Sequence, residues 1–166
     1  MAHEQVLIVM GSASDLPVME AAKATLDELK VSVSMRIASA HRTPEAVDEM
    51  AKAARDRGTR VIIAGAGYAA HLAGVIASKT TLPVIGVPLA SSDLAGVDSL
   101  LSTVQMPPGI PVATVGIGKA GAKNAAILAA QIIAVSDESV RKTLETQRKK
   151  TADAVLQADR KLQETE

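Results

Sequence analysis

Three short polar segments of this sequence carry side chains that could bind an anion and move a proton. In the second of them, residues 39–43, His41 stands beside Arg42. An imidazole exchanges protons near neutral pH, and a guanidinium attracts a phosphate or a carboxylate. Residues 39–43 therefore place two kinds of chemistry in adjacent positions. The alternative is structural, with His41 closing a strand and Arg42 a solvated surface charge.

The first segment, residues 11–15, supplies a glycine, two hydroxyls and a carboxylate at Gly11, Ser12, Ser14 and Asp15. A glycine lets a ligand approach the backbone closely, and the acid could accept hydrogen bonds from ribose hydroxyls. The alternative is a helix cap, in which Ser14 or Asp15 bonds the first free N–H groups of the next helix.

The third segment, residues 64–71, is built mainly from glycine and alanine and ends on a second histidine, His71. Small residues let backbone amides close on a ligand, but the spacing of Gly65 and Gly67 matches neither a P-loop nor a complete dinucleotide-binding fingerprint. His71 either points into a crevice or caps a helix. The case for a shared site comes from combining the segments, because hydroxyls, an acid, a guanidinium and two histidines would then meet.

Other chemistries find little support in the sequence. It has no cysteine, which excludes disulfides, thiolate metal sites and cysteine nucleophiles. His41 and His71 are far apart and His3 stands in a polar N-terminal stretch, so no local zinc motif exists. There is no Gly-x-Ser-x-Gly elbow, and residues 118–121 lack the ending of a Walker sequence. We expect no metal, and neither a hydrolase nor an NTPase.

Composition narrows the class of protein further. The chain has 166 residues, 18 basic residues balanced by 18 acidic ones, and a single residue of the Phe, Trp and Tyr types, Tyr68. Because the chain has no net charge to attract nucleic acid and almost no aromatic side chains on which bases could stack, nucleic-acid binding is not expected. No apolar run reaches membrane-spanning length. These features predict one domain, no membrane partner and a cytoplasmic location.

Hydrophobic periodicity predicts strands that alternate with helices. The expected strands are residues 6–10, 31–37, 60–64, 83–87 and 111–115, and the expected helices are residues 16–30, 44–57, 71–78, 97–104 and 118–134. Strands that are apolar throughout favour a parallel sheet covered on both faces. The three polar segments follow the first three strands, so they should meet at the carboxyl edge of the sheet, where such proteins bind ligands.

The segment at 39–43 should lead directly into a helix. Thr43, Pro44 and Glu45 have the residue types of an N-cap, a first helical position and an acid in the first turn. The free backbone N–H groups of that helix, together with Arg42, would favour an anion.

The charged tail, residues 137–166, differs from the rest of the chain. Val140, Leu144, Val155 and Leu162 fall near one helical stripe, and nothing interrupts a helix of about 27 residues, or about 40 Å. We expect it to project from the domain as an arm on a neighbouring subunit. The alternative is a solvated helix packed on its own subunit.

The polar segments recur, with two other motifs, in one enzyme family. The motifs are MGSASD at residues 10–15, SAHRTP at 39–44, AAHL at 69–72, GVP at 86–88 and GVDSLLSTVQMP at 96–107. Together and in this order they resemble the N5-carboxyaminoimidazole ribonucleotide mutases, the class I enzymes of bacterial-type purine synthesis.

The resemblance implies a flavodoxin-like three-layer α/β/α sandwich with a five-stranded parallel sheet and a projecting C-terminal helix. It implies a mutase catalytic domain at residues 1–136 and a charged helix at 137–166 that packs within a homo-octamer, with active sites between subunits. The implied reaction converts N5-carboxyaminoimidazole ribonucleotide to 4-carboxy-5-aminoimidazole ribonucleotide in IMP biosynthesis, without metal or cofactor.

The resemblance also assigns roles to residues. His41 would be the general acid and base, with His71 near the site, while Ser12, Asp15 and Arg42 would hold the ribose phosphate. The predicted catalytic residues are His41 and His71, and the predicted substrate-binding residues are Gly11, Ser12, Ser14, Asp15, Ser39, Ala40, Arg42, Gly67, Ala69, Ala70 and Leu72.

Two positions depart from the family's usual third motif. Tyr68 stands where a second glycine is usual, and Ala73 stands where proline is usual. Because tyrosine adopts left-handed backbone angles less easily than glycine, the sequence does not determine the path of this loop. Tyr68 either lines the site or is a tolerated surface substitution.

Two functional alternatives remain. One is the related class II enzyme, which carboxylates aminoimidazole ribonucleotide with free CO2 in the same fold; the His41-Arg42 pair and the AAHL motif favour class I. The other is a non-catalytic ribonucleotide-binding or receiver-like module. A receiver needs a cluster of acids, and the first segment supplies only Asp15.

Overall fold

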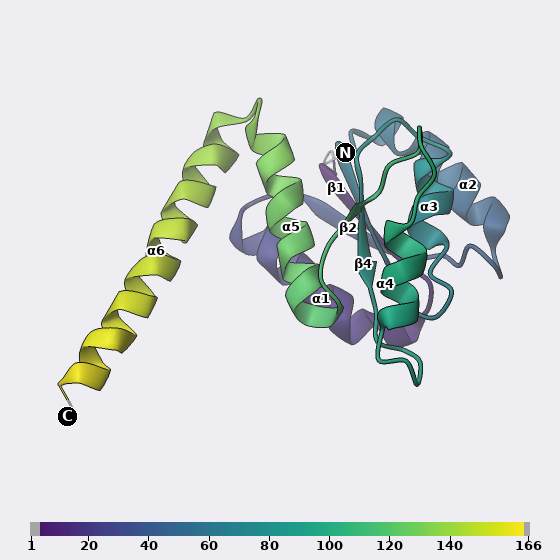
Figure 1. Cartoon of the computed structure of the whole chain (residues 1–166). Coiled ribbons are helices and arrows are strands. Elements are labelled where there is room, and N and C mark those ends of the chain that lie inside the picture. Colours follow the sequence, from purple (N-terminus) through teal and green to yellow (C-terminus); the bar gives the residue numbers. More distant parts are fainter. Residues whose placement is uncertain (1–3, 165–166) are drawn as a thin grey trace.

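Five parallel strands form the middle layer of the computed structural model, which describes residues 4–164 (Figure 1). They are β1 (Val6–Met10), β2 (Val33–Ile37), β3 (Val61–Ala66), β4 (Val84–Pro88) and β5 (Ala113–Thr114). Their spatial order is β2-β1-β3-β4-β5, which is the flavodoxin-like order of a doubly wound sheet. The predicted fold class is confirmed. His3 lies outside the described residues.

The central strands are apolar in every position because both of their faces are covered. Along β1, Val6 and Ile8 face one hydrophobic cluster, and Leu7 and Val9 face the other. All four side chains are buried. A period of two therefore sends alternate residues of one strand into two separate cores.

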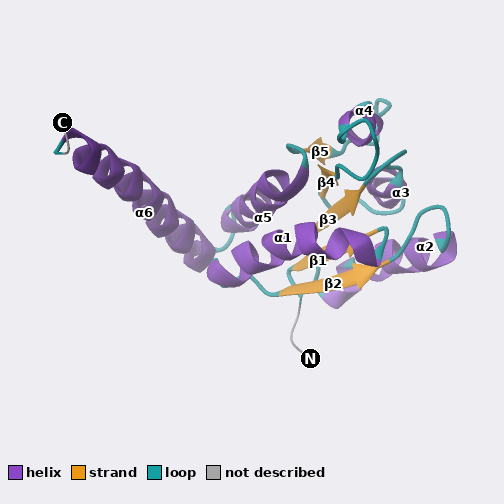
Figure 2. Cartoon of the chain, turned by 90° about the horizontal axis from the view of Figure 1, so that it is seen from below, coloured by secondary structure: helices purple, strands orange, loops and turns teal. Residues whose placement is uncertain are grey.

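Helices cover the two faces of the sheet (Figure 2). They are α1 (Leu16–Glu28) and α5 (Gly118–Ala134) on one face, α2 (Pro44–Ala53) and α3 (Leu72–Ala77) on the other, α4 (Val97–Val104) beside β4 and β5, and α6 (Glu138–Gln163). Two short 3-10 helices, η1 (Ala13–Asp15) and η2 (Arg55–Arg57), precede α1 and follow α2.

Small residues bring the helices of the first face close to the sheet. The buried side of α5 consists of Gly121, alanines and Ile133, and a Cβ atom on Gly65 of β3 would overlap the thioether of Met19 on α1. A larger side chain at either place would push the layers apart. The end of β3, where the third polar segment begins, is thereby fixed against α1.

Five elements are shorter than predicted, namely α1, β2, α2, α3 and β5. Strand β2 begins at Val33 because the N–H of Val31 closes the last turn of α1 on the carbonyl of Leu26, at 2.9 Å. Helix α2 ends at Ala53, since the chain tightens into η2 before Gly58 takes a left-handed φ of 91°. Strand β5 is reduced to two residues after Pro111, which has no N–H to donate.

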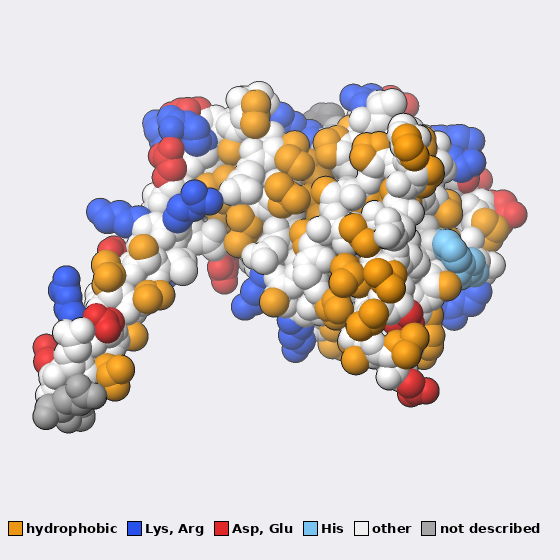
Figure 3. Space-filling model, in the orientation of Figure 1, with side chains coloured by type: hydrophobic (Ala, Val, Ile, Leu, Met, Phe, Trp, Pro, Cys, Tyr) orange, Lys and Arg blue, Asp and Glu red, His pale blue; other side chains and the backbone are white. Residues whose placement is uncertain are grey.

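Helix α4 turns its polar residues inward. Ser99 and Thr103 are buried, and their hydroxyls donate to the carbonyls of Leu89 at 2.9 Å and Ser99 at 2.6 Å. The outward face carries three half-exposed apolar residues, Val97, Leu101 and Val104. Apolar side chains gather over this helix in Figure 3. An amphipathic helix in this orientation leaves apolar surface uncovered on the chain alone.

Helix α6 leaves the sandwich as a long arm (Figures 1 and 2). The Asp137 carboxylate caps it by accepting from the N–H groups of Ser139 at 3.1 Å and Val140 at 3.2 Å. Val140 is buried against the core, whereas Val155 and Leu162 are each 66% exposed. The first turns thus pack against α5 and the remainder projects. None of the helices within residues 4–164 is long and apolar enough to cross a membrane.

Candidate active site

A cleft of about 460 Å³ opens where β1, β2 and β3 end. The order in which strands are added to the sheet changes sides there, since β1 has β2 as its neighbour on one side and β3 on the other. Such a switch point is where doubly wound sheets bind ligands. The cleft is lined by every residue that the sequence predicts for the site: Gly11, Ser12, Ser14, Asp15, Ser39, Ala40, His41, Arg42, Gly67, Ala69, Ala70, His71 and Leu72.

The first loop is organised by Ser12. Its hydroxyl oxygen accepts from the N–H of Ser14 at 3.3 Å and from the Ser14 hydroxyl at 3.0 Å, and so caps η1. The structural alternative, a cap by Ser14 or Asp15, is wrong: Asp15 occupies the N-cap position of α1 but makes no side-chain cap bond. Since η1 intervenes between strand and helix, the cap moves one turn earlier and the carboxylate of Asp15 remains in the cleft wall.

Asp15 is the buried acid of the cleft, with 7% of its surface exposed. Burial raises the pKa of its carboxyl above the ordinary value of 3.8, and the backbone of Ser12 and Gly11 and the charge of Arg42 oppose that rise. The loop thus places a partly desolvated carboxylate beside a guanidinium, which suits hydrogen bonding to ligand hydroxyls.

Arg42 joins the second loop to the first. Its Nη2 donates to the carbonyl of Gly11 at 2.8 Å, while its backbone N–H and Nε donate to the hydroxyl of Ser39 at 3.2 and 3.4 Å. The guanidinium is therefore oriented before any ligand arrives. Pre-positioned charge of this kind lowers the entropy cost of binding an anion.

Thr43 precedes α2 as predicted, but its side chain does not cap that helix. The Thr43 hydroxyl instead accepts from the N–H of Ser39 at 2.9 Å and lies 3.2 Å from the carbonyl of Ser39, to which it donates. Pro44 occupies the first helical turn. The hydroxyl thus closes the second loop on itself and holds the backbone between Ser39 and Arg42.

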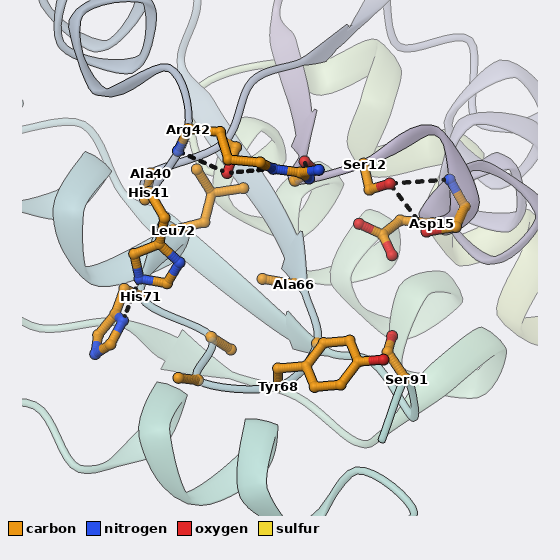
Figure 4. A pocket seen from close by; sticks show the side chains of 16 residues that line it. Ser12, Asp15, Ala40, His41, Arg42, Ala66, Tyr68, His71, Leu72 and Ser91 are labelled. Carbon is orange, nitrogen blue, oxygen red and sulfur yellow. Dashed lines mark hydrogen bonds between the residues drawn. The ribbon is translucent and has the colours of Figure 1, made fainter. Parts of the chain in front are cut away.

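The two histidines face each other across 30 residues of sequence. His41 Nε2 and His71 Nδ1 are 2.7 Å apart, and the rings meet edge to face with centroids separated by 4.9 Å at 84° (Figure 4). One nitrogen donates and the other accepts, so the bond couples the tautomers of the two rings. His71 stands at the N-cap position of α3 without a cap bond from its side chain. Its ring is directed at His41 rather than at the helix.

The third loop runs from Gly67 to the start of α3. A Cβ on Gly67 would overlap the side chain of Ser91, and the N–H of Ala70 donates to the Ser102 hydroxyl at 3.0 Å. Tyr68 adopts the left-handed region with a φ of 52°. A non-glycine residue there costs about 1–2 kcal/mol. The loop keeps the path that a glycine would favour, although tyrosine occupies it.

Three residues of the cleft were not among the predicted site residues: Ala66, Tyr68 and Ser91. Strand β3 continues to Ala66, two residues further than predicted. Ser91 follows β4, so the rule that polar residues after parallel strands share one edge could have identified it. Tyr68 borders the cleft while remaining 61% exposed, which leaves its ring free to contact a ligand.

Residues 4–164 contain no group of three or more His, Cys, Asp or Glu side chains placed to hold a metal ion. The groups that face the cleft are instead hydroxyls, one carboxylate, one guanidinium and two imidazoles. This set can bind an anion and exchange protons through the chain's own residues.

A flavodoxin-like sheet whose switch point carries an oriented guanidinium and a histidine pair defines an α/β enzyme that acts on a small anionic substrate. The chain belongs to the AIR carboxylase family, whose model matches residues 5–154. The family resemblance predicted from the motifs is confirmed.

Several proteins that are similar to this chain are named N5-carboxyaminoimidazole ribonucleotide mutase. The chain is 56% identical over 155 residues to the N5-carboxyaminoimidazole ribonucleotide mutase of Bacillus subtilis, covering 93% of this chain and 96% of the relative. It is 53% identical over 153 residues to the enzyme of that name in Escherichia coli K12, covering 92% and 90%. The crystal structure of Treponema denticola PurE superimposes with a TM-score of 0.85 at 32% identity, covering 95% of this chain and 97% of that one.

Proposed function

We propose that this chain is an N5-carboxyaminoimidazole ribonucleotide mutase, an isomerase of purine biosynthesis that forms 4-carboxy-5-aminoimidazole ribonucleotide. The observation that carries the proposal is the cleft itself, in which the His41–His71 pair at 2.7 Å lies at one end and the oriented Arg42 at the other. The high identity to relatives of that name supports the substrate.

Substrate binding follows from the charges of the cleft. The ribose phosphate binds to Arg42 and to the hydroxyls of Ser12 and Ser14, which face the same space. Asp15 accepts from a ribose hydroxyl. The five-membered ring then extends toward the third loop and the two histidines, which brings its exocyclic nitrogen and C4 within reach of His41.

The reaction needs one proton delivered and one removed. The bond between the exocyclic nitrogen and the carboxyl carbon breaks, CO2 leaves, and His41 protonates the nitrogen. Carbon C4 then attacks the same CO2, and His41 removes the proton from C4 as the ring regains aromaticity. Atoms and charge balance, because the proton that His41 gives is matched by the one that it takes back. Glycine and alanine of the third loop confine the CO2, so proximity replaces concentration.

The decisive experiment supplies N5-carboxyaminoimidazole ribonucleotide to the purified protein and follows the carboxylated product. Rapid isomerisation without metal, nucleotide or bicarbonate is expected. A matched reaction contains aminoimidazole ribonucleotide with a low concentration of bicarbonate. Efficient product formation in that reaction, together with no use of the carbamate, would identify a class II carboxylase and contradict the proposal.

We also propose a homo-octamer with active sites between subunits, in which α6 packs on a neighbouring copy. Three apolar residues on the outside of α4 favour assembly, with Val97 52%, Leu101 54% and Val104 47% exposed. Behind the histidine pair lies a second hollow of about 490 Å³, lined in part by Gly74 and Met106, through which a neighbour can reach the site. A cytoplasmic location stays a prediction.

Light scattering tests this assembly. The wild-type protein should have an octameric mass, and Leu101→Glu should lower it because a charge would enter an apolar contact. The control is Leu101→Met, which keeps the surface apolar and should leave the mass unchanged. A monomeric mass for the wild-type protein would contradict sites shared between subunits.

A further inference from the structure

Tyr68 combines a backbone conformation that disfavours its residue type with an exposed ring at the border of the cleft. Its backbone has a φ of 52°, which suits glycine better than tyrosine, and 61% of its surface is exposed. An ordinary surface substitution at such a position would favour glycine or a small polar residue. The side chain borders the cleft and also faces solvent.

The position of the ring within the cleft is complementary to that of Arg42. Figure 4 shows Tyr68 on the wall opposite Arg42 and Ser12, with its hydroxyl directed toward Ser91. The neighbours of Tyr68 along the loop, Gly67 and Ala69, are small and leave the ring standing alone. The anion-binding groups and the aromatic surface therefore occupy opposite sides of one space of about 460 Å³.

The two ends of a ribonucleotide match the two sides of this cleft, because a ribonucleotide has a phosphate at one end and a flat heterocycle at the other. The chain has one tyrosine and neither phenylalanine nor tryptophan, so Tyr68 offers the cleft its one ring of that kind. Aromatic faces stack on nucleobase-like rings without needing any specific hydrogen bond. The remaining residues of the third loop that line the cleft have no comparable flat surface, apart from His71.

We infer that Tyr68 is a specificity-determining residue whose ring packs on the imidazole of the bound ribonucleotide. The inference rests on the proposed function for the identity of that heterocycle. Phosphate contacts hold the nucleotide, and Tyr68 discriminates in favour of ligands that carry an aromatic base. The ring also restricts how far the heterocycle can swing away from His41 during the exchange of CO2.

The single tyrosine makes the test direct, because the intrinsic fluorescence of the protein arises from Tyr68. Full-length wild-type protein is titrated with aminoimidazole ribonucleotide and, separately, with ribose 5-phosphate, which lacks the imidazole ring. The first ligand should change the fluorescence saturably. The second should bind, by calorimetry, with little change in fluorescence. Equal changes with both ligands, or none with the first, would overturn the inference.

Variants separate the ring from the hydroxyl and from the backbone. Tyr68→Gly should weaken binding of aminoimidazole ribonucleotide about tenfold, from the usual loss on removing a stacked aromatic side chain. Tyr68→Phe should bind like wild type, and all variants should bind ribose 5-phosphate equally. Tyr68→Gly should melt no lower than wild type, since glycine suits the left-handed backbone. A loss in Tyr68→Phe as large as in Tyr68→Gly would assign the effect to the hydroxyl instead.

The outcomes for the ring and for the reaction are distinguishable. Wild-type protein that isomerises the carbamate while Tyr68→Gly binds as tightly as wild type refutes only the role of Tyr68. Wild-type protein that fails to isomerise the carbamate, but discriminates between the two ligands through Tyr68, refutes only the proposed reaction.

Discussion

The two ends of the cleft are built in opposite ways. At the anion end, Arg42 is bonded to Gly11 and Ser39 and is held in place by its own loops. At the histidine end, His41 and His71 are exposed and bond to each other. The first arrangement uses its hydrogen bonds to fix one side chain, and the second joins two imidazoles by a single hydrogen bond. Binding and chemistry are thereby assigned to separate loops, and single substitutions should separate them.

The largest effect is expected at His41. His41→Asn removes the group that gives and takes the proton, so kcat should fall by roughly 10²–10⁴, the range for general acid–base catalysis. Affinity for aminoimidazole ribonucleotide, measured by calorimetry, should change little because the anion end is intact. Unchanged turnover would remove His41 from the mechanism and assign the proton transfer to another group.

Arg42→Ala should produce the converse result. Loss of a charge-assisted contact of about 1.5–3 kcal/mol predicts binding that is about 10- to 150-fold weaker. The value of kcat at saturation should stay close to that of wild type. Arg42→Lys is the control, because it keeps the charge without the fork that reaches both Gly11 and Ser39. A lower kcat at unchanged affinity would show that the two ends are not independent.

His71 should contribute less than His41. His71→Ala removes one hydrogen bond to His41, and a net value of about 0.5–1.5 kcal/mol predicts a two- to tenfold fall in kcat. His71→Asn places an amide nitrogen near the position of Nδ1 and should restore most of the rate. If His71→Ala is instead as inactive as His41→Asn, then His71 itself transfers protons to the substrate.

The smallest effect concerns stability at the anion end. Because burial raises the folded-state pKa of Asp15 above 3.8, the folded protein keeps that proton to a higher pH than the unfolded chain. Its contribution is therefore fully present below the unfolded pKa and is lost as pH rises through the folded pKa. The Tm of Asp15→Asn, relative to that of wild type, should therefore increase as the pH is raised from acid to neutral.

Asp137 is the matched control with the opposite sign. Hydrogen bonds from the N–H of Val140 and from Ser139 lower the pKa of Asp137, so its contribution is present at neutral pH and is lost on acidification. Asp137→Asn should lose Tm relative to wild type as pH rises. Parallel behaviour of the two variants would refute the assignment of burial as the dominant effect at Asp15.

Sequence periodicity was sufficient for the layers and for the meeting of the three loops, because apolar strands fix which chain ends share an edge. Periodicity was not sufficient to predict which residue caps each helix. Ser12, Ser14 and Asp15 are all capping residue types, and the choice among them depends on the single turn of η1, whose formation is a tertiary outcome. Likewise Thr43 had an alternative partner in Ser39, four residues earlier, that periodicity does not reveal.

The ends of some helices and strands were predicted wrongly for a related reason. Val31 is apolar and β-branched, yet its N–H closes α1 instead of joining the sheet. Tyr68 illustrates the reverse problem. The left-handed turn required by the loop was foreseeable, but the ability of a tyrosine to hold it depends on surroundings that sequence alone does not describe.

Helix α4 has a consequence for how this protein responds to dilution. Its buried hydroxyls and outward apolar residues leave Leu101 and its neighbours half exposed on a single chain. In the proposed assembly those residues are covered, so folding and association are linked by mass action. The melting temperature should then rise with protein concentration, and dilution alone should act as a mild denaturant. In that assembly, part of the stability of each chain would come from its neighbours.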